Sequence, residues 1–185
     1  SSMTASTTSV WYYDWDVPSS FNGEITATVT GTDLAGNGYS GTESMTYKID
    51  NLNPTLVSFT DNNTNSYVNN NTNITLIATF SESMASSPTL SISGLVTNTS
   101  MTVSASTNST TWTYQWDVPS VIDGTYFATV SGTDLSGNSF TGTDSLTYSI
   151  DNIAPLIQSV TVTDTNSKIL LSYSEPIQLY DPTYF

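Results

Sequence analysis

The sequence contains no cysteine, histidine or arginine, and its only basic residues are Lys48 and Lys168. Without cysteine there can be no disulfide framework, thiolate zinc site or cysteine nucleophile. Without histidine, the usual serine nucleophile also lacks its general base. The sequence does not exclude a pair of carboxylates that hydrolyses glycosides. However, near-identical tandem halves rarely form enzymes, so we expect no catalysis.

Sixteen acidic residues against two lysines give a net charge of −14. Nucleic acid and anionic membrane surfaces are excluded as partners, because both require clustered basic residues. No apolar run approaches the roughly 18 residues that span a bilayer, so we expect no membrane insertion in this segment. A divalent cation is the partner that the charge favours. The alternative is that the acidity only keeps the protein soluble.

The most informative pattern present is an internal repeat. Residues 11–54 recur as residues 112–155, an offset of 101 residues, with 26 of 44 positions identical. The shared blocks include WDVPS, GTDL-GN and IDN--P. A period near 100 residues is too long for a solenoid unit and matches one independently folding domain. The chain is therefore expected to be a window of a tandem array within a longer protein.

Alternating apolar residues, rich in threonine and aromatics, predict strands throughout the repeat. In residues 54–151 we expect seven strands, over 56–60, 74–80, 90–92, 101–105, 112–118, 126–130 and 146–150. Pro119 ends the fifth strand, because proline cannot join a central ladder. Short strands at this spacing predict an all-β fold of tandem Ig-like seven-stranded β-sandwiches.

Two aromatic features of the unit have alternative interpretations. Trp112 and Trp116, which match Trp11 and Trp15, lie on one strand face together with Tyr114. We expect them to fill the core with Ile74, although a sugar-stacking platform is the competing reading. Tyr126 stands where sandwich folds place a tyrosine corner.

The repeat divides the chain into three pieces. Residues 1–50 match the C-terminal half of a unit, residues 54–151 form a complete unit, and residues 155–185 open a third. Each partial piece is expected to be completed by sequence outside this window or by a strand from a neighbouring subunit. The short, proline-containing joints DNLNP and DNIAP favour stiff connections.

The segments ATFSESMASSP, WTYQWDVPS, ATVSGTDLSGN and DNIAP resemble the bacterial Ig-like repeats of giant surface adhesins and surface-layer proteins. The acidic joints are also similar to those of cadherins. This resemblance covers essentially the whole chain. It implies extracellular sandwiches on a prokaryotic cell surface, arranged end to end and frequently stiffened by calcium. It implies no catalysis.

The topology of such a sandwich would gather acidic side chains at the joints. Two loops of the complete unit, carrying Glu82 and Asp134, should return to the joint that carries Asp50 and Asn51, with Asn53 a weaker candidate. The second joint offers Asp151, Asn152 and Glu175. Carboxylates, amides and carbonyls together suit calcium, which takes six to eight oxygens. Alternatively, Asp134 only shapes its loop through an Asx turn.

Five N-x-[ST] sequons lie in the complete unit, at Asn62, Asn70, Asn73, Asn98 and Asn108. They matter only if the source organism glycosylates asparagine.

The sequence alone is compatible with three functions. The first is a calcium-stiffened spacer in a long adhesin or fibre involved in cell adhesion, with neighbouring repeats as its partners. The second is a surface-layer or filament subunit that packs against copies of itself. The third is a carbohydrate-binding module, which requires exposed aromatic side chains.

Overall fold

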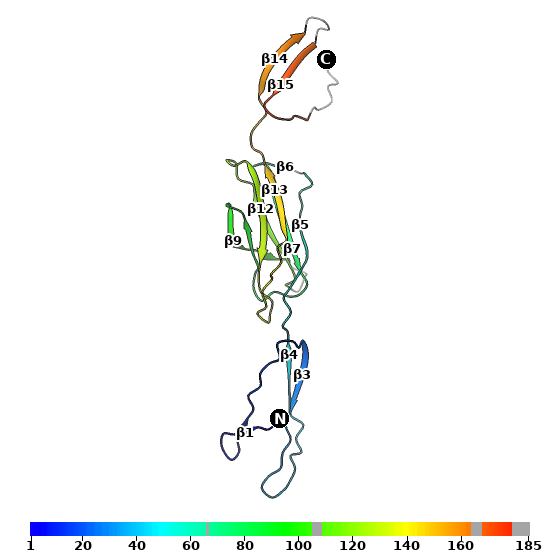
Figure 1. Cartoon of the computed structure of the whole chain (residues 1–185), viewed down its shortest axis with the longest axis vertical. Coiled ribbons are helices and arrows are strands. Elements are labelled where there is room, and N and C mark those ends of the chain that lie inside the picture. The colour runs from blue at the N-terminus through cyan, green and yellow to red at the C-terminus, as the bar shows by residue number, and fades with distance from the viewer. Residues whose placement is uncertain (66, 105–108, 164–167, 179–185) are drawn as a thin grey trace.

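The structure is a computed structural model that describes residues 1–65, 67–104, 109–163 and 168–178. Every regular element within these ranges is a β-strand, so the predicted all-β class is confirmed. Three groups of strands follow one another along the long axis of the molecule, with the largest group in the middle (Figure 1). The described residues include no helix long and apolar enough to cross a membrane.

The middle group folds into two sheets. The first has the strand order β10-β11-β7-β5, from β5 (Leu56–Asp61), β7 (Asn73–Phe80), β10 (Thr102–Val103) and β11 (Thr111–Asp117). The second has the order β6-β13-β12-β8-β9, from β6 (Tyr67–Val68), β8 (Thr89–Ile92), β9 (Val96–Ser100), β12 (Gly124–Ser131) and β13 (Ser145–Ile150). All pairs are antiparallel except β6 with β13. Two such sheets in contact form the predicted sandwich.

The core lies between these sheets and consists of the alternating residues that the sequence indicated. Leu76 on β7 is fully buried, and Trp112 and Trp116 on β11 are only 5 % and 3 % exposed. The rings of Trp116 and Tyr148 meet edge to face at 5.2 Å and join the two sheets. The predicted core is confirmed, with Tyr114 only partly buried. The sugar-platform interpretation is wrong for this unit, because its tryptophans face inward.

Two strands depart from the prediction. The strand expected over 101–105 is replaced by β9 and β10, which lie in different sheets on either side of buried Met101. The chain therefore changes sheet at Met101, whose N–H donates to the Pro88 carbonyl at 2.9 Å. Val103 is 43 % exposed, and Ala105 lies outside the described residues. An alternation pattern cannot show which partner a strand chooses.

The second departure is β6, which lies in the mostly polar stretch of residues 61–72. It pairs in parallel with the end of β13, where Val68 is opposite Ile150 and only 3 % exposed. A strand of two residues gives too little alternation to be recognised. With β6 and the divided strand, the described part of the unit has nine strand segments, β5 to β13, instead of seven.

In the described residues of the two end pieces, every sheet has two strands. The N-terminal piece has β1 (Thr4–Ala5) paired with β2 (Trp11–Tyr12), and β3 (Gly23–Thr28) paired with β4 (Ser44–Ile49). The C-terminal piece is a hairpin of β14 (Ile157–Thr163) and β15 (Lys168–Tyr173). Among the described residues, large apolar side chains in both pieces are exposed. The division at the two joints therefore stays a prediction.

Candidate cation site at the joint between units

The first linker is fixed to the unit that precedes it. The backbone N–H of Asn51 donates to Asn22 Oδ1 at 2.6 Å. The Asn51 side-chain amide donates to the carbonyls of Pro18 and Phe21, at 3.2 and 2.7 Å. These acceptors lie in the turn before β3, so this asparagine ties the linker to the end of its own unit. Its amide nitrogen is therefore used as an anchor, and its predicted role as a metal ligand stays a prediction.

The second linker repeats this anchor. The N–H of Asn152 donates to Asp123 Oδ1 at 2.6 Å, and its amide donates to the carbonyls of Pro119 and Ile122. Its remaining amide oxygen accepts from the N–H of Asn70 at 2.8 Å. Asn152 therefore acts as an anchor within the complete unit, and its predicted role as a metal ligand stays a prediction.

Asp134 belongs to the loop between β12 and β13, here called the Asp134 loop (residues 132–144). Its side chain is fully buried. Oδ1 accepts the N–H groups of Ser136 and Asn138, both at 2.8 Å, and Oδ2 accepts the Asn138 amide at 2.9 Å. Gly137 has φ +93°, the left-handed conformation that closes this turn at least cost. Asp134 therefore does shape its loop, as the Asx-turn reading expected.

Asn138 links this loop to the first linker. Its amide nitrogen donates to the Asp50 carbonyl at 3.1 Å, in addition to its bond with Asp134. Sequence reasoning missed this residue, although its position in GTDL-GN, repeated at Asn37, was the available signal. The complete unit thus contacts the linker that precedes it through Asn138 of the Asp134 loop.

The loop between β7 and β8, the Glu82 loop (residues 81–88), is held beside the Asp134 loop. The N–H of Ala85 donates to the Thr133 carbonyl at 3.0 Å, and Met84 forms a β-bridge with Asp134. A Cβ on Gly132 would come within 2.8 Å of the Met84 side chain. The two loops therefore approach each other closely at this glycine.

Three carboxylates meet where the linker and these two loops converge. One oxygen from each of Asp50, Glu82 and Asp134 lies within 4.8 Å of the others. The structure therefore brings together three of the four residues predicted for the first joint. No other group of three metal-binding side chains is close enough to hold an ion in the described parts of the chain.

The three negative charges of this cluster repel one another. Burial raises the pKa of Glu82, and the negative charges of Asp50 and Asp134 raise it further. Burial also acts to raise the pKa of Asp134, but the hydrogen bonds from Asn138 and the loop N–H groups outweigh it and leave the pKa lowered. Asp134 is thus held ionised beside a glutamate that resists ionisation. A cation among the three oxygens would relieve this repulsion.

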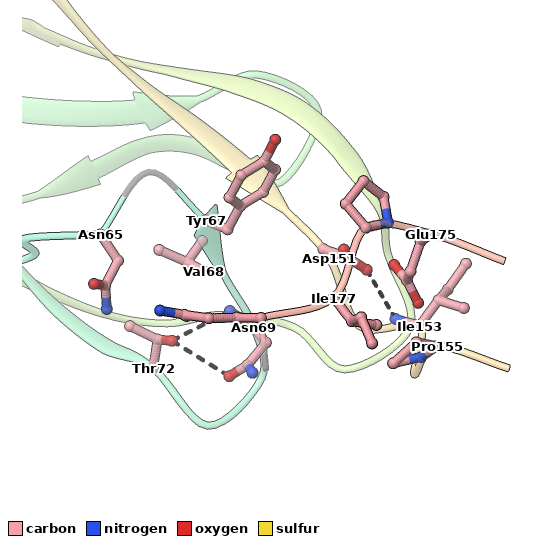
Figure 2. A pocket seen from close by; sticks show the side chains of 12 residues that line it. Asn65, Tyr67, Val68, Asn69, Thr72, Asp151, Ile153, Pro155, Glu175 and Ile177 are labelled. Atoms are coloured by element: carbon pink, nitrogen blue, oxygen red, sulfur yellow. Dashed lines mark hydrogen bonds between the residues drawn. The ribbon is translucent and has the colours of Figure 1, made fainter. Parts of the chain in front are cut away.

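The second joint carries a smaller version of the cluster. Figure 2 shows Glu175 and Asp151 on the wall of a cleft between the complete unit and the C-terminal piece. Glu175 Oε1 is shielded from solvent and has no hydrogen-bond partner. Burial raises the pKa of Glu175, followed by the charges of Asp151 and Asp123. Two predicted residues therefore meet here, while a counterpart of Asp134 is not among the described residues.

Comparison with protein families identifies the class of fold. The family model described as bacterial Ig-like domain (group 3) matches residues 9–156, and the chain belongs to this family. Such domains typically occur in extracellular or surface proteins and are generally not enzymes. Searches of curated proteins and of solved structures give no significant match. The family establishes a bacterial Ig-like repeat without assigning it an adhesive target or a metal.

Proposed function

We propose that this chain is an extracellular spacer of a prokaryotic surface adhesin or fibre, and that calcium fixes consecutive units in one orientation. The observation that carries the proposal is the group of three carboxylate oxygens from Asp50, Glu82 and Asp134. These oxygens come from a linker and from two loops of the unit that follows. A cation bound there would connect the linker directly to both loops.

The donor set suits a hard cation. Carboxylate oxygens are the ligands that calcium and magnesium share, and no nitrogen or sulfur ligand is offered at this point. Calcium is favoured because it accepts six to eight oxygens in irregular geometry, whereas magnesium demands a near-ideal octahedron. Neighbouring carbonyls and water would supply the remaining ligands.

The stiffening effect follows from where the linker is already held. Asn51 fixes the linker to the preceding unit through three hydrogen bonds. On the other side, Asn138 provides a direct hydrogen bond to the Asp50 carbonyl. A cation would replace repulsion between Asp50 and the loop carboxylates with attraction, so that the linker is fixed on both sides. A flexible joint would then become part of a rod.

The sequence supplies a matched control for a test of this proposal. Asp33 in the N-terminal piece makes the same loop bonds as Asp134, accepting from the N–H groups of Ala35 and Asn37 and from the Asn37 amide. In the described structure, however, Asp33 is not part of a carboxylate cluster. Asp33→Ala therefore removes an Asx turn alone, whereas Asp134→Ala removes both a turn and a predicted cation ligand.

The experiment is calcium titration calorimetry of the full chain, combined with small-angle scattering in calcium and in chelator. We expect heat of binding, and a more sharply defined maximum dimension with calcium. Asp134→Ala should abolish both responses, and Asp33→Ala should leave both intact. Identical scattering profiles in calcium and in chelator, with no heat of binding, would mean that the acidic residues only keep the protein soluble. Equal effects of the two substitutions would assign Asp134 to loop shape only.

A second candidate function, a filament or surface-layer subunit, is favoured by a separate observation. The apolar sheet faces of both end pieces are exposed, with Trp11 at 54 % and Leu171 at 48 %. Packing of copies against one another in a filament or lattice would cover such faces.

A further inference from the structure

The first segment of the complete unit, residues 56–68, lies at an edge of both sheets. β5 is an edge strand of the four-stranded sheet, and β6 is an edge strand of the five-stranded sheet. Among the pairs formed by the described strands, only that of β6 with β13 is parallel. The segment by which the chain enters the unit therefore runs beside the strand by which it leaves, in the same direction.

Buried contacts join this first segment to β13. The Tyr148 hydroxyl on β13 donates to Asp61 Oδ2, at the end of β5, at 2.5 Å. Val68 of β6 is paired with Ile150 of β13, and both side chains are buried in the core. Shielding from water strengthens the hydrogen bond and makes separation of the two apolar side chains costly.

Two further hydrogen bonds continue these contacts into the second linker. The N–H of Asp151 donates to the Val68 carbonyl at 3.0 Å. The N–H of Asn70 donates to Asn152 Oδ1 at 2.8 Å. The two segments are therefore held together as far as the point where the chain leaves the unit. The contacts between residues 61–70 and residues 148–152 are here called the clamp.

The positions of the two linkers determine how tension would act on the clamp. β6 and the end of β13 lie at the end of the unit that faces the C-terminal piece, whereas the linker before β5 leaves at the opposite end (Figure 1). A pull on both linkers therefore draws residues 56–68 toward one end and β13 toward the other. Parallel neighbours pulled in this way slide along each other, so their contacts are stretched together. Neighbouring strands pulled apart at a shared end separate one contact at a time.

We propose that the clamp has a mechanical function, which is to keep the complete unit folded when the chain is stretched between its two linkers. This inference rests on the proposed spacer function, because a spacer between a cell and a distant contact is stretched along its length. Forced unfolding is governed by the rate of unfolding rather than by its free energy. Contacts that must break together raise the barrier for this direction of pull, even though they are few.

The clamp does not depend on the proposed cation. The cluster of Asp50, Glu82 and Asp134 includes the first linker, whereas the clamp includes the second. Resistance to force should therefore persist in chelator. A failure of calcium binding would leave the clamp intact, and a failure of the clamp would leave the calorimetric test of calcium binding unaffected.

The first test is single-molecule force spectroscopy of the full chain in chelator. The chain has no cysteine, so two introduced cysteines define the direction of pull. Leu52→Cys with Ile153→Cys pulls on the two linkers, and opening should release on the order of 300 Å of chain. Asn71→Cys with Ile153→Cys is the matched control, because it pulls β6 and β13 apart at their shared end. All three positions are exposed. We expect a severalfold higher opening force for the first pair.

The second test removes one hydrogen bond of the clamp while the pull stays on the two linkers. Tyr148→Phe should lower the opening force, because the bond to Asp61 joins the two segments that the linkers pull. Asn73→Ala is the matched control. The Asn73 amide also donates to a carboxylate at 2.5 Å, Asp117 Oδ1, but this bond joins β7 to β11, away from both linkers. Its loss should leave the opening force close to the native value.

Two results would overturn the proposal. Equal opening forces for the two cysteine pairs would show that the direction of pull does not matter, and this test leaves every residue of the clamp unchanged. Equal loss of force in Tyr148→Phe and Asn73→Ala would show that the contacts contribute only to general stability. Guanidinium unfolding of each variant verifies that the complete unit is folded before it is pulled.

Discussion

The N-terminal piece and the complete unit share most of one sequence but differ in burial. Trp112 is 5 % exposed, whereas its counterpart Trp11 is 54 % exposed. Tyr148 is 2 % exposed, and its counterpart Tyr47 is 42 % exposed. One contact survives in both: Trp15 and Tyr47 pack with ring centroids 5.6 Å apart, close to the 5.2 Å of Trp116 and Tyr148.

The difference shows that local sequence sets which strand face is apolar, whereas burial of that face requires a complete sandwich. Alternation alone sets which face of a strand carries the apolar side chains, so the aromatic pair forms in both copies. Burial of that face needs the strands β5, β7 and β8, which occur in the complete unit and supply the opposite surface. The hydrophobic stabilisation depends on this removal of area from water.

The largest effect is expected from the buried tryptophan. Trp116→Ala should lower the free energy of unfolding of the complete unit by about 3–5 kcal/mol, because it leaves a cavity in the core. Trp15→Ala, measured at a concentration where the chain is monomeric, should change the same transition by less than about 0.5 kcal/mol. Guanidinium unfolding measures both. A loss below about 1 kcal/mol for Trp116→Ala would place its ring on the surface.

A smaller effect is expected from the Tyr148 hydroxyl, which donates to Asp61 Oδ2 at 2.5 Å. Tyr148→Phe should cost about 1–3 kcal/mol, since a hydrogen bond to a carboxylate is lost. Tyr47 lacks this partner and donates instead to the Met45 sulfur, so Tyr47→Phe should cost far less. Chemical denaturation of the two variants provides the comparison.

The same hydroxyl predicts a pH dependence. Burial, followed by the bond to Asp61 and the charge of Asp61, raises the pKa of Tyr148. The folded state therefore favours the neutral phenol, and this contribution is fully present below the ordinary tyrosine pKa of about 10. It should be lost as the pH rises above that value. Tyr148→Phe should show a weaker alkaline loss of stability, and an unchanged alkaline profile would contradict the assignment.

The two joints allow a third comparison. Glu82→Gln should stabilise the calcium-free chain by up to about 1 kcal/mol, because it removes repulsion within the cluster. The same change should abolish calcium binding at the first joint. Glu175→Gln, at the joint where only two of the predicted carboxylates meet, should leave that binding unchanged. Calorimetry of the two variants measures this difference. Native-like calcium binding by Glu82→Gln would show that the cluster is not the calcium site.

The sign of the pH effect at this joint follows from the raised pKa of Glu82. The folded joint prefers the protonated carboxyl, so acidification from neutral pH through the glutamate range stabilises the calcium-free form. Calcium requires the ionised carboxylate, so its affinity should fall over the same range. An affinity for calcium that does not change with acidification would contradict this linkage.

The smallest effect is expected at the tyrosine corner. The Tyr126 hydroxyl donates to the Asp123 carbonyl at 3.5 Å, the outer limit of such a bond. The N-terminal piece has Ile25 at the matching position. Tyr126→Ile should therefore cost about 0.5 kcal/mol. A thermal melt detects the difference, and a loss comparable with that of Trp116→Ala would mean that this corner is essential to the fold.

The sequence by itself determined the class of fold and the content of the core. The period-two pattern of Ile74, Leu76, Ala78 and Phe80 specified both a strand and its buried face, because side chains alternate across a pleat. The 101-residue repeat predicted the joints, and strand order alone predicted that Asp50, Glu82 and Asp134 would converge. Each of these inferences rests on local periodicity or on which end of a sandwich a loop occupies.

Only the tertiary structure decided how the chain passes between sheets and how the joint is held. The change of sheet at Met101 depends on which edges are free, and local alternation carries no information about edges. The anchoring role of Asn152, which the sequence did not indicate, depends on four partners from distant turns. A hydrogen bond is set by positions in space, so residues far apart in sequence acquire these roles only after the sheets have packed.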